Sequence, residues 1–305
     1  MSKLSLPGLD GRSPMGVMAA CGLLRVITRM MPERLPKLSW VKVSRTAELH
    51  MPDGAETLET ILMRALEYRL NSRVLTLGDD IKLPPEEYQR WVLECLSDTS
   101  DGTYGDDLIE FMPAFGSDQI TQSVKNAIKT TPFHMTAGQQ RFLRMVRELV
   151  QTLGQEESIA EKMNEALFEP WAYRDKVHSM GWNPAGERTH AYQQEAPSKS
   201  KAKGVMLAVW LAFEALPLFP CMATGRKLRT SAFTGYGRKQ FFHWSLWFEP
   251  ISLIAVKTLN SHMGKEMRGA DVPVAGLYEL YSSRRMPLGD KGFSVFKPSV
   301  MGHLR

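Results

Sequence analysis

Cysteine is scarce in this chain: only Cys21, Cys95 and Cys221 occur among 305 residues. No two of them form a CxxC pair, so neither a disulfide framework nor a local cysteine zinc site can be built from them. Low cysteine use is typical of proteins kept in a reducing compartment. The sequence therefore predicts a cytoplasmic protein.

Long hydrophobic runs are also missing. The apolar stretch 15–27 contains Arg25, and the stretch 205–219 is about 15 residues long and contains Glu214 and Pro217. Crossing a bilayer takes about 20 consecutive apolar residues, and a secretory signal needs a small-residue cleavage site after its apolar segment. We therefore expect buried helices here and no membrane partner.

The usual catalytic motifs are absent from the sequence as well. It contains no GxSxG elbow, no HExxH pair, no GxxxxGK[ST] phosphate loop and no strand–GxGxxG–helix unit. Its seven histidines all stand more than five residues from one another, and the acidic stretch 98–107 lacks the spacing of an EF-hand loop. We expect a non-catalytic protein without a metal or a cofactor, and a solvated loop at 98–107.

Hydrophobic residues make up 43% of the chain and charged residues 23%, which is ordinary for a globular protein. Apolar residues at helical spacing predict helices over 55–70 and 137–150, and the stretch 38–49 is typical of a strand. Aromatic-rich segments near the C-terminus also predict strands. The expected fold class is α+β, with a helix-rich middle and strands towards both ends, as one compact unit or two interlocked lobes.

A change in composition suggests an internal boundary. Residues 183–204 lose the hydrophobic periodicity and end in Lys199, Lys201 and Lys203. We expect a mixed α/β N-terminal lobe over 1–182, a basic surface loop over 183–204, and a C-terminal lobe over 205–305 with a helix and aromatic, basic strands.

The stretch 215–248 is the strongest functional signal in the sequence. It has no acidic residue, and its basic residues alternate with glycines and with aromatic side chains such as Phe241 and Trp244. Cations bind phosphates, flat rings stack on unpaired bases, and glycines let the backbone approach both. Aromatic side chains at alternate strand positions also fill protein cores, so both interpretations stay open. The candidate nucleic-acid-binding residues are Lys199, Lys201, Lys203, Arg226, Lys227, Arg229, Arg238 and Lys239.

Several segments also resemble a known protein family. They are LDGRSPMGVMAACGLLRVI at 9–27, TPFHMTAGQQRFLR at 131–144, HSMGWNPAGERTHAY at 178–192, LAFEALPLFP at 211–220 and FFHWSLWFEPISLIAVKTL at 241–259. The order of these segments and their residue patterns resemble proteins of type I-U/I-G CRISPR interference systems. The resemblance implies a subunit or accessory protein of a Cascade-like, RNA-guided antiviral complex, with guide RNA, target DNA and other effector subunits as partners.

Two other functional classes remain compatible with the sequence. A metal-dependent hydrolase or nuclease could assemble from distant positions, and its residues would be Asp106, Asp107, His134, His178 and His190. A protein–protein adaptor of the same complex could instead dock its aromatic C-terminal region on a neighbouring subunit.

Overall fold

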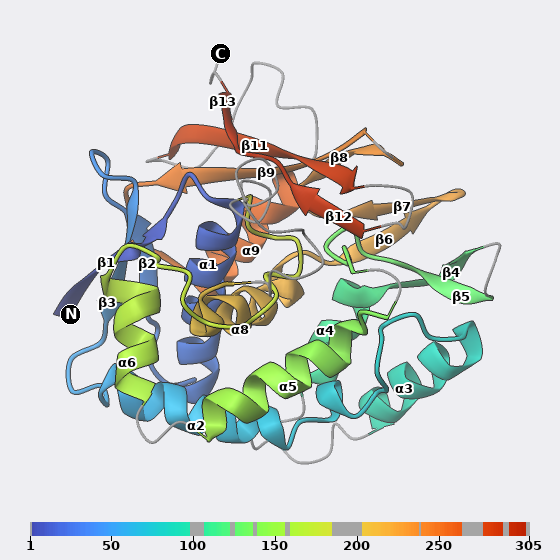
Figure 1. Cartoon of the computed structure of the whole chain (residues 1–305), viewed down its shortest axis with the longest axis horizontal. Coiled ribbons are helices and arrows are strands. Elements are labelled where there is room, and N and C mark those ends of the chain that lie inside the picture. The colour runs from blue at the N-terminus through green and yellow to red at the C-terminus, as the bar shows by residue number, and fades with distance from the viewer. Residues whose placement is uncertain are drawn as a thin grey trace, which may run out of the picture.

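The fold is α+β, as the sequence predicted (Figure 1). The computed structural model describes residues 2–97, 107–122, 126–136, 139–155, 159–184, 203–237, 239–263, 277–288 and 293–302. None of the helices in these ranges is long and apolar enough to cross a membrane.

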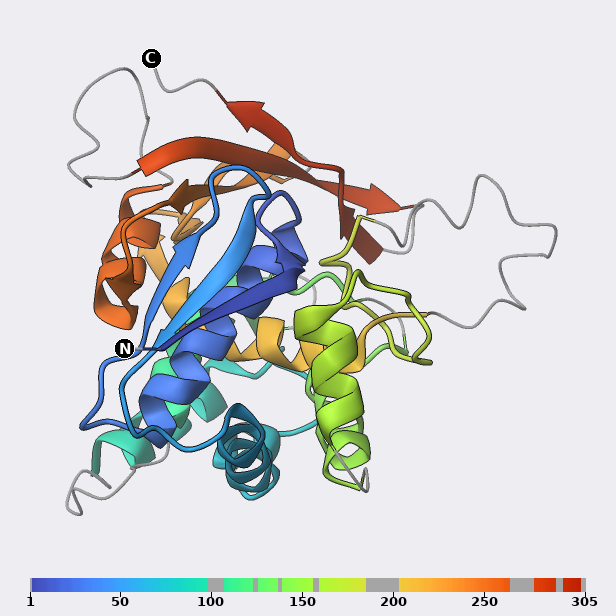
Figure 2. The same cartoon turned by 90° about the vertical axis from the view of Figure 1, so that its left-hand side faces the viewer.

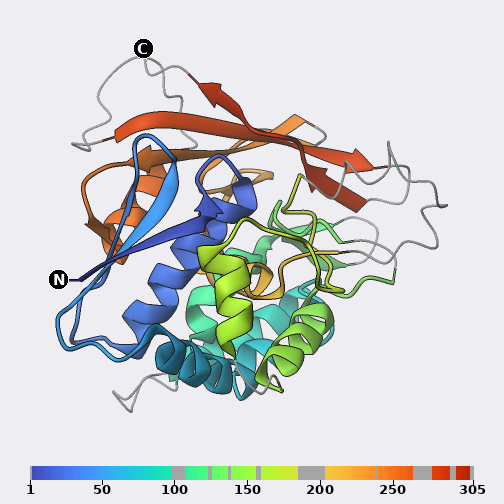
Figure 3. The same cartoon turned by 60° about the vertical axis from the view of Figure 1, so that its left-hand side comes forward.

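The described helices gather below a curved sheet, in the orientation of Figure 1. They are α1 (Pro14–Met30), α2 (Leu58–Leu70), α3 (Pro85–Ser97), α4 (Leu108–Phe115), α5 (Phe142–Gly154), α6 (Ile159–Met163), α8 (Met206–Glu214) and α9 (Leu253–His262), with the short turns η1 (Arg73–Leu75), η2 (Asn164–Phe168) and η3 (Leu216–Leu218). Figure 3 shows α2 and α5 packed together at the end of the molecule opposite this sheet.

The centre of the fold is the contact between α1 and α8. Ser13 caps α1 by accepting a hydrogen bond from the Gly16 amide, and Pro14 occupies the first helical turn, where a missing N–H costs nothing. A side chain at Gly22 would place its Cβ 1.7 Å from the carbonyl oxygen of Leu211 on α8. The backbones of these two helices therefore approach each other directly, and only glycine fits at position 22.

A four-stranded antiparallel sheet covers one side of α1 (Figure 2). Its order is β1 (Ser2–Asp10), β3 (Thr46–Met51), β2 (Lys37–Trp40) and β10 (Ile251–Ser252). The single strand expected over 38–49 is in fact the hairpin β2–β3. Its turn closes where Arg45, at a φ of 60°, donates its amide to the Val41 carbonyl.

A second antiparallel sheet forms the top of the molecule in Figure 1. Its strands are β12 (Phe293–Phe296), β11 (Leu277–Leu288), β9 (Lys239–Trp247) and β8 (Phe233–Tyr236) in this order, with β13 (Val300–Gly302) also paired to β11. Trp244 and Trp247 point inward, and their indole nitrogens donate to the carbonyls of Gly11 and Leu38, each at 2.7 Å. These two tryptophans fix the sheet on the N-terminal part of the chain.

Two small hairpins complete the described strands. They are β4 (Gly116–Gln122) with β5 (Ala127–Thr130), and β6 (Cys221–Thr224) with β7 (Lys227–Thr230).

The two halves of the chain interlock. One hydrophobic core includes residues from Leu6 to Phe296, α8 packs on α1, and β10 extends the N-terminal sheet. Residues 185–202 of the expected basic loop lie outside the described ranges, but Gly204 just after them donates its amide to the Asp175 carbonyl at 2.8 Å. The three-part division of the chain stays a prediction.

Candidate nucleic-acid interface

The outer face of the β8–β9–β11 sheet carries aromatic and basic side chains together. Side chains of a strand alternate between the two faces, and residues directly opposite each other on neighbouring strands share a face. Phe241 of β9 stands opposite Thr234 of β8 and Arg284 of β11. Lys239, two residues before Phe241, stands opposite Tyr236. We call this outer surface of β8, β9 and β11 the aromatic–basic face.

Exposure separates the two kinds of aromatic residue on these strands. On the aromatic–basic face, Phe241 is 36% and Tyr236 43% exposed, whereas Phe242 and Trp244 on the opposite face are 0% and 1% exposed. Phe242 stacks on Phe233 with ring centroids 5.4 Å apart inside an aromatic core. The core-filling interpretation therefore applies to Phe242 and Trp244, whereas Phe241 and Tyr236 meet solvent and stay candidates for stacking on bases.

The β6–β7 hairpin extends this face. The ammonium nitrogen of Lys227 lies 4.4 Å from the centroid of the Tyr236 ring, within the range of a cation–π contact. Arg226 and Arg229 are exposed on the same hairpin, and Gly225 at its turn has a φ of 58°, which favours glycine. The cations of two hairpins and the exposed rings thus form one surface.

This surface carries uncompensated positive charge. Residues 215–248 contain no acidic side chain, and within the described chain Arg226, Lys227, Arg229, Lys239 and Arg284 form no ion pair. In contrast, Arg45, beyond this face, is bound by Glu279 at 2.8 Å. Exposed cations without acidic partners attract polyanions, and exposed rings beside them can stack on unpaired bases.

The structure brings four of the predicted residues together: Arg226, Lys227, Arg229 and Lys239 lie on the two hairpins. Lys203 is exposed beside Gly204, away from these hairpins in the sequence, while Lys199, Lys201 and Arg238 lie outside the described residues. Sequence reasoning missed Arg284, which reaches this face through the pairing of β11 with β9. Nothing in LYELYSSRRMPL distinguishes Arg284 from the neighbouring Arg285, so the sequence carried no signal for it.

The residues considered for a hydrolase have other partners. Asp107 is buried and binds Arg25 and Arg69, each at 2.7 Å. Burial alone would raise the pKa of Asp107, but the charges of Arg69 and Arg25 outweigh it and hold that pKa well below its usual range. Position 107 is therefore no solvated loop position, contrary to the expectation, because its carboxylate binds two buried guanidinium groups.

The histidines of that hydrolase hypothesis lie apart from Asp107. The ring of His134 bonds to Asp80 at 2.9 Å, and that of His178 to Gln140 at 3.4 Å. Burial lowers the pKa of both histidines. Asp106 and His190 lie outside the described residues, within which no three metal-ligating side chains cluster.

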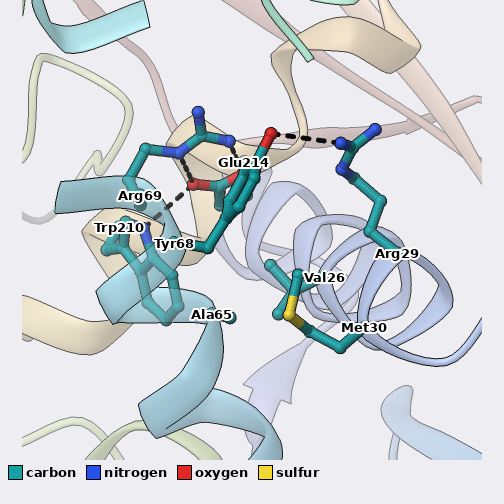
Figure 4. Close-up of a pocket in the computed structure, with 8 residues that line it drawn as sticks. All are labelled: Val26, Arg29, Met30, Ala65, Tyr68, Arg69, Trp210 and Glu214. Carbon is teal, nitrogen blue, oxygen red and sulfur yellow. Dashed lines mark hydrogen bonds and ion pairs between the residues drawn. The ribbon is translucent and has the colours of Figure 1, made fainter. Parts of the chain in front are cut away.

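A small hollow borders the ion-paired cluster (Figure 4). Glu214 points into it and accepts hydrogen bonds from Arg69 Nε at 2.6 Å and Trp210 Nε1 at 3.0 Å. The hydroxyl of Tyr68 accepts from Arg29 at 3.2 Å. The polar groups of this hollow are thus bound to one another, so we interpret it as part of the structural core.

Comparisons with known proteins add no relative. A scan against models of protein families finds no match, and a search of curated proteins finds no similar sequence.

Proposed function

We propose that this protein binds single-stranded nucleic acid through the aromatic–basic face, without catalysing a reaction. The observation that carries the proposal is the combination of exposed Phe241 and Tyr236 with unpaired cations on one sheet surface. Bases stack on such rings irrespective of sequence, and flexible cations follow the phosphates. A duplex offers no unstacked bases, so the exposed rings favour a single strand over a double helix.

The wider role that we propose is that of a subunit of a CRISPR RNA-guided antiviral complex. The resemblance of five segments to type I-U/I-G interference proteins supports it, and a surface for guide RNA or displaced target DNA fits such a complex, where base pairing reads the sequence and protein grips the backbone. Neighbouring helicase-nuclease and repeat-processing genes would strengthen this proposal, and their absence would remove its main support.

A pair of substitutions on the same strand tests the binding role. Phe241→Ala should weaken binding of a fluorescent 12-mer of single-stranded RNA or DNA by roughly 5- to 150-fold, because one stacked base contributes about 1–3 kcal/mol. Trp244→Ala should instead lower the free energy of unfolding by about 3–5 kcal/mol, since Trp244 is buried and bonded to Gly11. Fluorescence anisotropy and chemical denaturation measure the two effects.

Trp91→Ala is the matched control. Trp91 is a half-buried aromatic on α3, and the guanidinium carbons of Arg73 and Arg90 both lie 5.7 Å from its ring. Trp91 therefore combines an aromatic ring with neighbouring cations, as Phe241 does, but lies on a helix outside the aromatic–basic face. Equal losses of affinity for Phe241→Ala and Trp91→Ala would contradict the assignment of binding to the aromatic–basic face.

A further inference from the structure

Arg285 lies on the inner face of β11. The residue before it, Arg284, lies on the outer, aromatic–basic face. Arg285 pairs with Gln240 of β9, which stands between Lys239 and Phe241. The guanidinium donates to the Gln240 side-chain oxygen at 3.2 Å and to the His134 carbonyl at 3.3 Å. Arg285 therefore connects the end of the sheet to the loop around His134.

No carboxylate of the described chain compensates the charge of Arg285. Its side chain is half-buried, and its buried Nε finds no hydrogen-bond acceptor. A guanidinium has five N–H donors, and two neutral oxygens serve it here. Burial lowers the pKa of Arg285, whereas fully buried Arg25 and Arg69 are each bound by carboxylates.

Arg285 shares its surroundings with His134, Lys82 and Asp80. The charges of Arg285 and Lys82 both act on His134, and the nearby carboxylate of Asp80 is already bound to the His134 ring at 2.9 Å. A partly desolvated guanidinium without a counter-charge destabilises the fold, and an anion from solution would offset that cost. Guanidinium groups bind the oxygens of both carboxylates and phosphates, and phosphate is the anion that a nucleic acid on the aromatic–basic face would supply.

We propose that Arg285 and Gln240 form a binding site for one phosphate group at the end of the β9–β11 pair. The inference rests on the proposed function for the source of that phosphate, the backbone of a single strand that leaves the aromatic–basic face beside Lys239. Phosphate of a free nucleotide would satisfy the same chemistry. The site would fix the position at which the nucleic-acid strand leaves the sheet. Stacking on the rings alone would allow the nucleic acid to bind in several positions along the face.

Direct titration of the full-length wild-type protein with inorganic phosphate and pyrophosphate, followed by ³¹P NMR at constant ionic strength, is the first arm of the test. We expect saturable binding that Arg285→Gln abolishes and Arg285→Lys weakens but retains. Arg90→Gln, which removes an exposed cation on α3, should leave it unchanged. Wild-type protein that shows no saturable phosphate binding would overturn the inference, whether or not the variants fold.

The second arm measures binding of a single-stranded 12-mer, with wild type, Arg285→Gln and Phe241→Ala side by side. Arg285→Gln should weaken binding by about tenfold or more, the effect of removing one charge-assisted hydrogen bond, and inorganic phosphate should compete with the oligonucleotide. If the 12-mer does not bind but phosphate still requires Arg285, the site serves a free phosphate compound and the proposed function fails. If the 12-mer requires Phe241 and is indifferent to Arg285→Gln, the proposed function stands and this inference fails.

Discussion

Replacing Glu214 with alanine should destabilise the protein by about 3–5 kcal/mol, because it leaves buried guanidinium charge uncompensated. Glu214 is 2% exposed and binds Arg25 Nη1 at 3.0 Å and Arg69 Nε at 2.6 Å. Without it, Asp107 would be the only buried carboxylate bound to both arginines, because Glu110 at the edge of the network binds Arg25 and Arg29 but not Arg69. Urea denaturation of wild type and Glu214→Ala measures the effect.

Glu110→Ala is the control within the same network. Glu110 also binds Arg25, at 2.7 Å, but its side chain is 39% exposed, so water can replace it. We expect a loss of about 1 kcal/mol or less for this variant. Equal losses of unfolding free energy for Glu214→Ala and Glu110→Ala would contradict our claim that the burial of a carboxylate determines how much it stabilises the network.

Removing the cations of the aromatic–basic face should have the largest effect on binding. We expect the variant with Lys227, Arg229, Lys239 and Arg284 all changed to alanine to bind a single-stranded 12-mer more than about a hundredfold more weakly. The log–log dependence of affinity on salt should become shallower by roughly 0.7 for each phosphate that the variant no longer binds. All four side chains are exposed, so the melting temperature should hardly change.

A fourfold variant elsewhere controls for net charge. Arg90, Arg141, Arg144 and Lys257 are exposed cations on or beside α3, α5 and α9. Changing them to alanine removes the same charge and should leave most of the affinity and the salt slope in place. If this variant loses as much affinity as the first, binding depends on overall charge. If neither variant loses affinity, the basic hairpins are a structural or protein-docking surface and the adaptor role takes their place.

Local sequence patterns predicted the elements whose causes are local. Helix α1 follows from Pro14 and the apolar residues behind it, and the aromatic-rich segment predicted the strand β9 without telling which of its rings are buried. The hairpin turn at Arg45 escaped prediction, because its positive φ has no marker such as glycine at that position.

The ion-paired network could not be predicted from the sequence. Arg25 and Glu214 are separated by 189 positions, and each lies in a mostly apolar helix. Asp107 is the last residue of the acidic stretch 98–107, whose composition predicts a solvated loop. The aromatic–basic face was half predicted for the same reason: Arg226, Lys227, Arg229 and Lys239 are close in the sequence, whereas Arg284 joins them only through strand pairing.

Photo-crosslinking tests the central claim most directly, because it locates the bound base on the protein. A single-stranded 12-mer with 5-bromouracil bases would be irradiated on the full-length protein at low salt, and the modified peptides identified by mass spectrometry. Our account predicts cross-links to Tyr236 or Phe241, which disappear when excess unlabelled single strand competes. Specific cross-links confined to other surfaces, such as α3 around Trp91, would contradict it.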